Sequence, residues 1–265
     1  MNKEEFLSCT QKKWESDFFK RDIRELSFDG PLIPNELDRM LDELDQSGVW
    51  GIEVLVTPEQ ISNVPTLEDA GFRLVDSKMS FISKLSISDV VPKPVPFGRL
   101  RQVRKEDLPC VSELTVRHLV DNPVVYSRFK NPDLYSREES IRYYDAWNLR
   151  AFREQPELFV VWEVEGEVGA YFNYMRFDHP QFKPYFKGIL TVVDPRYRGR
   201  NAQNIMQSFL FEKFQEPEWW IDNTTQISNT AVIKNHIKAG KAFHGSELIF
   251  FRVSVSPTEY PSETK

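Results

Sequence analysis

Residues 189–206 read ILTVVDPRYRGRNAQNIM, and this stretch determines how the rest of the chain is interpreted. Residues 188–193 form a near-continuous apolar run, which predicts a buried strand. From residue 202 to about residue 214 the apolar side chains follow helical spacing, so a helix is predicted directly after a short loop. The loop carries three arginines, Arg196, Arg198 and Arg200.

A strand that leads through a basic loop into a helix suits the binding of an anion. The first turn of a helix has free backbone N–H groups and the positive end of the helix dipole, so a phosphate is stabilised there. Arginines add charge-assisted hydrogen bonds to the same anion. The alternative interpretation is an ordinary strand-to-helix turn with arginines on the surface.

The segment resembles the pyrophosphate loop of the GNAT acyl-CoA-dependent N-acetyltransferases, where a valine, a spacer and a proline lead into an arginine- and glycine-rich turn. The positions that fit are Val193, Pro195, Arg198 and Gly199. Asn201 and Gln203 stand where the family usually has glycine. Asparagine tolerates the left-handed backbone conformation better than other non-glycine residues, so Asn201 is the milder departure. The resemblance implies a CoA site formed by Val192, Val193, Arg198, Gly199, Arg200, Asn201, Ala202 and Asn229.

A second segment, SNTAVIKNHIKAGKAF at residues 228–243, resembles the asparagine-led helix that lines the pantetheine arm in this superfamily. Helical spacing predicts one shared face for Asn229, Val232, Ile233, His236, Ile237 and Gly240. The resemblance implies that Asn229 holds the arm. It also implies that His236, where the family has a tyrosine, is the general acid for the departing thiolate. Histidine exchanges protons near neutral pH, and a core histidine on an apolar stripe is the alternative.

Most of the chain is similar to the nucleotide-linked amino-sugar N-acyltransferases of the dTDP-fucosamine acetyltransferase type. The similarity lies in WESDFF at 14–19, in SRFK at 127–130 with YYDAW at 143–147, and in NTA at 229–231. It implies a dTDP-linked aminodideoxyhexose as the acceptor, for cell-surface polysaccharide building blocks. The implied donor is acetyl-CoA or a short hydroxyacyl-CoA such as 3-hydroxybutyryl-CoA.

Independently of this similarity, the segment 127–147 is basic and aromatic. Side chains of these types bind a diphosphate and stack on a base or a sugar. An exposed, charged helix face is an equally weighted alternative. The predicted acceptor-binding residues are Arg128, Lys130, Tyr144 and Trp147.

The predicted fold is α/β (α+β), the GNAT fold, with a mixed, mostly antiparallel central sheet flanked by helices. A smaller, truncated GNAT-like domain is expected before it. Three prolines within residues 90–96 predict an extended linker, because proline lacks a backbone donor and disfavours helix at the residue before it. The expected domains are residues 1–90, a linker at 91–97, and a catalytic domain at 98–265.

Composition narrows the expected partners. A net charge of −6 argues against nucleic acid. Apolar runs fall short of the roughly 18 residues that span a membrane, and the first residues lack an apolar signal core, so a cytoplasmic protein is expected. Cys9 and Cys110 do not have metal-ligand spacing, and no metal is expected. The predicted partners are acyl-CoA and a nucleotide-linked amino sugar, with a homodimer left open.

The predicted reaction is direct attack of a sugar amine on the acyl-CoA thioester, whose carbonyl is polarised by backbone N–H groups around Val192 and Val193. Two alternatives stay open. One is a GNAT acetyltransferase that acts on a peptide, an antibiotic or another small amine. The other is a catalytically silent CoA-binding module, which the missing loop glycines favour.

Overall fold

The computed structural model describes residues 6–89, 93–124, 126–212, 214 and 216–254, and the chain forms two compact units. Residues 1–78 with 246–265 form the first unit, and residues 79–245 form the second. The predicted division differs, since it assigned every residue after a linker at 91–97 to one domain. The difference arises because strand β11 (Phe243–Val253) returns the chain to the first unit. Residues 90–92 of that linker lie outside the described residues.

In the first unit, β1 pairs antiparallel with β2, β2 parallel with β3, and β3 antiparallel with β11. Its elements are β1 (Leu7–Gln11), α1 (Lys13–Phe19), β2 (Ile23–Phe28), α2 (Pro34–Gln46), β3 (Gly51–Val56), a 3₁₀ helix (Pro58–Asn63), α3 (Val64–Asp69) and the start of β4 (Arg73–Ser86). Helix α2 buries Leu37, Leu41 and Leu44 along one face. Neither β1 nor α1 was predicted.

In the second unit, the strand order is β4-β9-β8-β7-β6-β5. The strands are β5 (Arg99–Gln102), β6 (Phe159–Val164), β7 (Glu167–Phe177), β8 (Tyr185–Val193) and β9 (Glu218–Asp222), with the short β10 (Thr225–Gln226) beside β4. All pairs in this order are antiparallel except β8 and β9, which run parallel. The sheet is therefore mixed and mostly antiparallel, as predicted.

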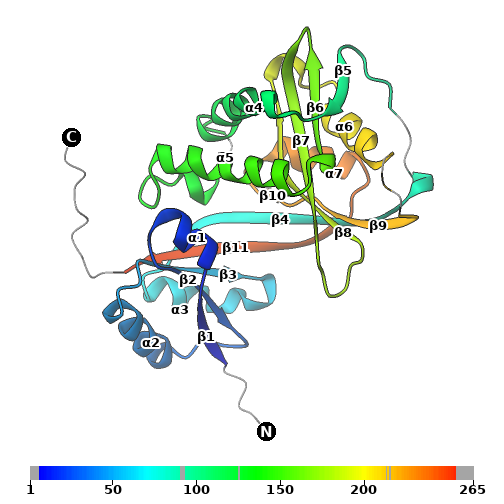
Figure 1. Cartoon of the computed structure of the whole chain (residues 1–265). Helices are drawn as coiled ribbons and strands as arrows, with labels where there is room; N and C mark the ends of the chain where they lie inside the picture. The colour runs from blue at the N-terminus through cyan, green and yellow to red at the C-terminus, as the bar shows by residue number, and fades with distance from the viewer. Residues whose placement is uncertain (1–5, 90–92, 125, 213, 215, 255–265) are drawn as a thin grey trace, which may run out of the picture. The chain divides into compact units, whose positions relative to one another are not determined.

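Helices cover both faces of this sheet (Figure 1). On one side lie α4 (Leu108–Thr115), its π-helical continuation (Val116–Val120) and α5 (Arg137–Glu154). On the other side lies α6 (Ala202–Phe211), and α7 (Thr230–Lys238) follows β10. Apolar side chains from the sheet pack on the α4/α5 face, including Val161 and Tyr171, and on the α6 face, including Trp162 and Phe172. Because both faces are buried, the central strands read as near-continuous apolar runs.

Strand β8 contains a β-bulge that reverses the side-chain alternation along it. Asn173 of β7 is opposite Leu190, and Tyr174 is opposite Gly188, so Ile189 is the extra residue. Before the bulge, Phe186 packs on the α6 face. After it, Leu190 packs on the α4/α5 face. Without the extra residue, these two even-numbered side chains would point to the same side.

A buried chain of hydrogen bonds holds the bulge. The Leu190 N–H donates to Asn173 Oδ1 at 2.8 Å, and Asn173 Nδ2 donates to Asn148 Oδ1 on α5 at 3.1 Å. Asn148 Nδ2 in turn donates to Thr115 Oγ1 on α4 at 3.2 Å, and Thr115 Oγ1 lies 2.6 Å from the Tyr171 hydroxyl. The chain thus links β8 to β7, α5 and α4.

Replacing Asn173 should test this link. In Asn173→Ala, the buried N–H of Leu190 and the side-chain oxygen Oδ1 of Asn148 each lose their hydrogen-bond partner. Each loss carries a desolvation penalty. We expect the free energy of unfolding in urea to fall by about 2–3 kcal/mol. The matched control is Gln181→Ala, which removes an exposed amide from the β7–β8 hairpin and should change it by less than about 0.5 kcal/mol. Equal effects from both variants would contradict a supporting role for Asn173.

Candidate functional site

The candidate site begins where β8 and β9 part. Their parallel pairing joins Tyr185–Lys187 to Trp220–Asp222, where β9 ends, while β8 continues to Val193. Residues 188–193 of β8 therefore extend past the last described residues that pair with β9. We call the side of residues 188–193 that faces away from β7 the open edge. A strand edge of this kind presents backbone donors and acceptors to a partner.

The direction of each N–H on β8 follows from one hydrogen bond. The Asp194 N–H donates to the Gly169 carbonyl of β7 at 3.0 Å. Successive N–H groups of a strand point to opposite edges, so those of Thr191 and Val193 face the open edge and that of Val192 faces β7. Backbone N–H groups around Val192 and Val193 were predicted as the donors to a ligand. The Val193 N–H faces the open edge, as does that of Thr191, whereas the Val192 N–H faces β7 and the side chain of Val192 is buried in the α4/α5 core.

The loop after β8 is built around Asp194. Its carboxylate accepts hydrogen bonds from the Arg196 backbone N–H (2.9 Å) and from Arg196 Nε (3.0 Å). The same guanidinium holds the pKa of Asp194 below its usual range. The Arg196 guanidinium is therefore paired with a carboxylate of its own loop, although the Arg196 side chain is exposed.

The other two loop arginines also have partners within the chain. Arg198 Nε donates to the Val193 carbonyl at 2.9 Å, and the Arg200 guanidinium lies 4.5 Å from the Phe97 ring centroid. Both residues are exposed. Since Arg198 bonds to Val193, its guanidinium lies beside the open edge.

Two left-handed residues shape the end of the loop. Gly199 has φ +74° and Asn201 has φ +60°, so Asn201 takes the conformation that was expected of it. Asn201 is the N-cap of α6 without a side-chain cap hydrogen bond, and Ala202 begins the helix. The first-turn N–H groups of α6 are thereby left for another acceptor. Gln203, the second departure, is half-buried in that turn.

Helix α7 lies differently from the prediction. His236 is the buried residue of this helix, whereas Ile237 is 64% exposed and Asn229, the N-cap, is half-buried. The expected apolar stripe is therefore wrong at Ile237, because α7 buries one position rather than a full face. The His236 ring lies 5.0 Å from the Phe81 ring of β4, and burial, followed by the charge of Lys241, lowers the pKa of His236 to about 3.

Two basic residues of the second unit lie in surroundings that were not predicted. Lys241 follows α7 and Gly240, and its Nζ is buried with no hydrogen-bond partner among the described residues. Burial lowers the pKa of Lys241 to about 7. His118 lies in the π-helical turn with Nε2 3.9 Å from Asp194 Oδ2, and burial, then Arg198, lowers its pKa. Sequence spacing gave no signal for either residue, since both depend on distant elements.

Of the predicted acceptor-binding residues, Arg128 and Tyr144 are buried, whereas Lys130 and Trp147 are half-buried. Arg128 is buried with its guanidinium 4.3 Å from the Phe129 ring centroid, and the Tyr144 hydroxyl lies 2.8 Å from Ser127 Oγ. Trp147 contacts the rings of Phe129, Tyr143 and Tyr144. Lys130 Nζ donates to the Asn122 carbonyl at 2.5 Å. The rings of Phe129, Tyr143, Tyr144 and Trp147 form an aromatic cluster that joins the segment before α5 to the helix.

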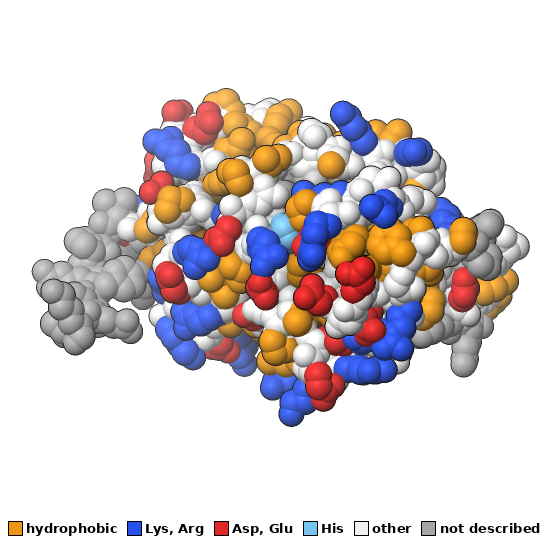
Figure 2. All heavy atoms as spheres, turned by 90° about the horizontal axis from the view of Figure 1, so that it is seen from above, with side chains coloured by type: hydrophobic (Ala, Val, Ile, Leu, Met, Phe, Trp, Pro, Cys, Tyr) orange, Lys and Arg blue, Asp and Glu red, His pale blue; other side chains and the backbone are white. Residues whose placement is uncertain are grey.

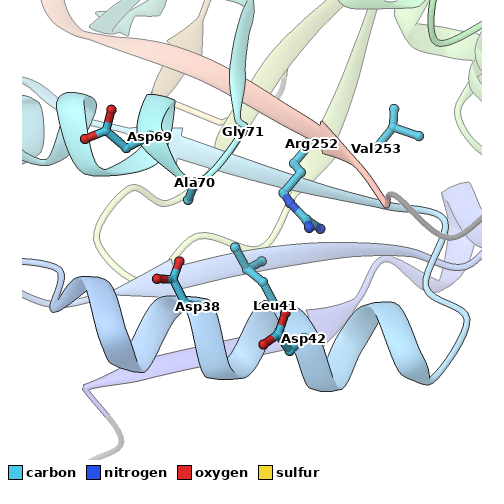
Figure 3. A pocket seen from close by; sticks show the side chains of 8 residues that line it. All are labelled: Asp38, Leu41, Asp42, Asp69, Ala70, Gly71, Arg252 and Val253. Atoms are coloured by element: carbon cyan, nitrogen blue, oxygen red, sulfur yellow. The ribbon is translucent and has the colours of Figure 1, made fainter.

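The first unit has a pocket of about 520 Å³ between α2, the end of α3 and β11 (Figure 3). Its charged lining residues are Asp38, Asp42, Asp69 and Arg252. Arg252 extends towards α2, where it forms two hydrogen bonds with the Asp45 carboxylate at 2.8 and 2.6 Å. This arginine is thus neutralised by a structural ion pair.

Across the described ranges, there is no group of three or more His, Cys, Asp or Glu side chains suited to a metal ion. None of the described helices is both long and apolar enough to cross a membrane. Basic and acidic side chains are interspersed on the face shown in Figure 2. A basic field of the kind that binds nucleic acid backbones is not the pattern of this face.

The second unit has the GNAT fold, with a bulged strand, a diverging parallel neighbour and a helix that starts after a basic loop. A GCN5-related N-acetyltransferase from Sphaerobacter thermophilus superposes with a TM-score of 0.59 at 12% identity, covering 96% of this chain and 78% of that one. Another from Kribbella flavida gives 0.53 at 10%, covering 87% and 81%. A tandem GNAT protein from the clavulanic acid biosynthesis pathway gives 0.51 at 12%, covering 89% and 76%. No family model and no curated protein matches the sequence.

The buried amine of Lys241 has a measurable consequence for stability. Its pKa is about 7 in the folded chain and about 10.5 in the unfolded chain, so the unfolded chain binds more protons between these values. Stability should therefore rise with pH across this window. At pH 7, Lys241→Met should be more stable than the wild type by about 2–4 kcal/mol, and the difference should shrink by about pH 9.5.

Urea unfolding of both proteins across this pH range measures the difference. Lys238→Met is the control, because Lys238 is exposed at the end of the same helix. It should shift stability by less than about 0.5 kcal/mol at either pH. A Lys241→Met difference that stays constant with pH would show that this amine is not buried in an unpaired state.

Proposed function

We propose that this chain is an acyl-CoA-dependent N-acyltransferase whose donor lies along the open edge of β8. The observation that carries the proposal is the parting of β8 from β9 at Lys187 and Asp222, with the N–H groups of Thr191 and Val193 directed into the opening. A pantetheine arm carries amide and thioester carbonyls, which accept hydrogen bonds from such groups. These two N–H groups are about 7 Å apart along the strand, so one can hold an amide carbonyl of the arm while the other polarises the thioester carbonyl without reorganisation.

The pyrophosphate of CoA would lie at the start of α6. The left-handed residues Gly199 and Asn201 flank Arg200, and the helix that begins at Ala202 has no side-chain cap. Backbone N–H groups and the helix dipole favour an anion at this point. Arg198 and Arg200 are exposed beside it and add positive charge. Asn229 at the start of α7 is the candidate for holding the pantetheine arm.

The proposed reaction is direct acyl transfer. The acceptor amine attacks the thioester carbon, a C–N bond forms, and the C–S bond breaks with its electron pair on sulfur. The amine loses a proton and the thiolate gains one. His236, the proton donor proposed from the sequence, is buried against Phe81 and neutral at pH 7, so it would have to donate from a neutral imidazole.

The acceptor is proposed as a primary amine, with a dTDP-linked aminodideoxyhexose as the candidate that the sequence resemblance supplies. The side chains first proposed to hold it, Arg128 and Tyr144, are buried. If a nucleotide sugar is the acceptor, other residues must bind its diphosphate. A peptide, antibiotic or other small amine is the competing acceptor class.

The loop role can be tested with Arg198→Ala combined with Arg200→Ala. Loss of both charge-assisted contacts should weaken CoA binding by about 2–4 kcal/mol in calorimetry. Arg176→Ala is the matched control, because Arg176 is exposed on the β7–β8 hairpin and pairs with Glu216. It should leave CoA affinity unchanged. If the double variant also binds CoA as the wild type does, the loop does not hold the pyrophosphate.

Activity is tested by thiol release from acetyl-CoA and from 3-hydroxybutyryl-CoA with a panel of amines that includes dTDP-amino sugars. An enzyme releases thiol in proportion to acylated product. A CoA-binding module binds acyl-CoA but releases no thiol with any amine. Preference for a dTDP-amino sugar over its unlinked sugar and over simple amines would support the narrower acceptor proposal, and equal rates would exclude it.

A further inference from the structure

Arg200 differs from the other two arginines of the loop after β8 in how its guanidinium is held. Arg196 pairs with a carboxylate of the loop, and Arg198 donates to a carbonyl of β8. The Arg200 guanidinium lies over the Phe97 ring, 4.5 Å from its centroid, and forms no hydrogen bond or ion pair with any residue that the structure describes. Because Arg200 is exposed, its N–H groups and its face away from Phe97 are accessible to a ligand.

The Phe97 ring under this guanidinium is fixed by its neighbours. It stacks on Trp162 of β6 with ring centroids 5.1 Å apart, and the Trp162 indole N–H donates to the Phe97 carbonyl at 2.8 Å. The Tyr197 ring centroid lies 5.6 Å from that of Phe97. Both Phe97 and Tyr197 pack against the core on the α6 face. The ring that supports Arg200 is therefore held in one position by contacts within the chain.

Two glycines allow these aromatic side chains to lie so close to the sheet. A Cβ on Gly169 of β7 would lie 2.5 Å from Tyr197 Cε2, a distance at which the ring would have to move. A Cβ on Gly98 would lie 2.2 Å from the Glu163 carbonyl oxygen, and Gly98 has φ +68°. Glycine is the residue that tolerates both the close approach and this backbone conformation. The sequence thus specifies where Phe97 and Tyr197 lie.

The two rings lie on the side of β8 that is away from the open edge. β8 pairs with β7, and β7 pairs with β6. Tyr197 lies over β7 and Phe97 over β6, whereas Arg198 is bonded at the open edge. In CoA, the pyrophosphate joins the pantetheine arm to adenosine. With the arm along the open edge and the pyrophosphate at the start of α6, the adenosine extends from the loop towards Arg200.

We propose that the adenine base of CoA stacks on the exposed face of the Arg200 guanidinium, in a layered arrangement of Phe97, Arg200 and adenine, an inference that rests on the proposed function. A base has a flat π face, and bases stack on aromatic rings and on arginine planes. The guanidinium is attracted to the Phe97 ring on one side and to the base on the other. Its N–H groups remain available to the pyrophosphate in the same complex.

The test measures dissociation constants by calorimetry for acetyl-CoA, for acetyl-3′-dephospho-CoA, which keeps the base, and for acetyl-4′-phosphopantetheine, which lacks it. Arg200→Lys keeps the positive charge and loses the planar face, and because Arg200 is exposed the core is not disturbed. This variant should bind both base-containing donors about 5- to 50-fold more weakly than the wild type, as for the loss of one stacking contact. Since the charge is kept, its affinity for acetyl-4′-phosphopantetheine should stay within about twofold.

Phe97→Leu tests the layer beneath the guanidinium. Leucine keeps an apolar contact with Trp162 but offers no π face, so both base-containing donors should bind about 2- to 10-fold more weakly. The affinity for acetyl-4′-phosphopantetheine should not change. Arg176→Lys is the matched control, because Arg176 is exposed on the β7–β8 hairpin and pairs with Glu216. It should bind all three donors as the wild type does.

Saturation-transfer NMR with CoA gives a readout that is specific to the base. In the wild type, saturation of the protein should reach the ring protons of adenine and the methyl groups of the pantetheine arm. In Arg200→Lys, the adenine signals should fall relative to those of the methyl groups. Arg176→Lys should leave the ratio of these signals unchanged.

Three outcomes overturn the adenine site. Equal weakening of all three donors by Arg200→Lys would assign this side chain to the phosphate next to the arm, and weakening of acetyl-CoA alone would assign it to the 3′-phosphate. Unchanged affinity for every donor that the wild type binds would leave Arg200 without a role in binding. Failure of the proposed function gives a different result, because a wild type that binds no acetyl-CoA removes the transferase proposal and this inference together.

Discussion

The hydrogen bond from the Leu190 N–H to the Asn173 side chain is the constraint on which the candidate site depends. A bulge adds one residue to a strand and leaves a backbone group to be satisfied locally. Here a buried amide satisfies it, and the side chains after the bulge exchange faces, so that Leu190 enters the α4/α5 core. The same exchange fixes which N–H groups point to the open edge. A loss at Asn173 would therefore alter the site as well as the core.

The amide of Asn173 is itself held by α5 and α4 through Asn148 and Thr115. Helices on one face of the sheet thus help to fix the backbone geometry of the open edge of β8. Such a buried polar chain is stabilising only while every member is paired. It also joins the helix that carries His118 to the strand that leads to Asp194. The rigidity of the site is consequently shared among elements that are distant in sequence.

Local signals predicted the parts of the fold that depend on neighbours in sequence. Glu165 and Gly166 form a two-residue turn between β6 and β7 with φ +52° and +85°, a local conformation that tight hairpins require. Asn201 adopts the left-handed conformation for the same local reason. The bulge at Ile189 was not predictable, because its partner Asn173 lies on another strand. Packing between segments that are distant in sequence also determines which side chains are enclosed, as it does for Lys241, Ile237 and Arg128. The spacing of residues along one helix does not predict such packing.

Strand β11 gives the first unit an unusual dependence on chain order. Its residues 248–253 pair with β3, at the other end of the sequence, and bury Phe250 in the core formed by Leu37 and Val54. During synthesis this sheet stays incomplete until the second unit has already left the ribosome. Successive domains usually fold in the order in which they are synthesised. The first unit cannot complete its sheet in this order, because β11 is synthesised after the second unit. The edge of β3 that pairs with β11 in the folded chain has no such partner until residues 248–253 are made.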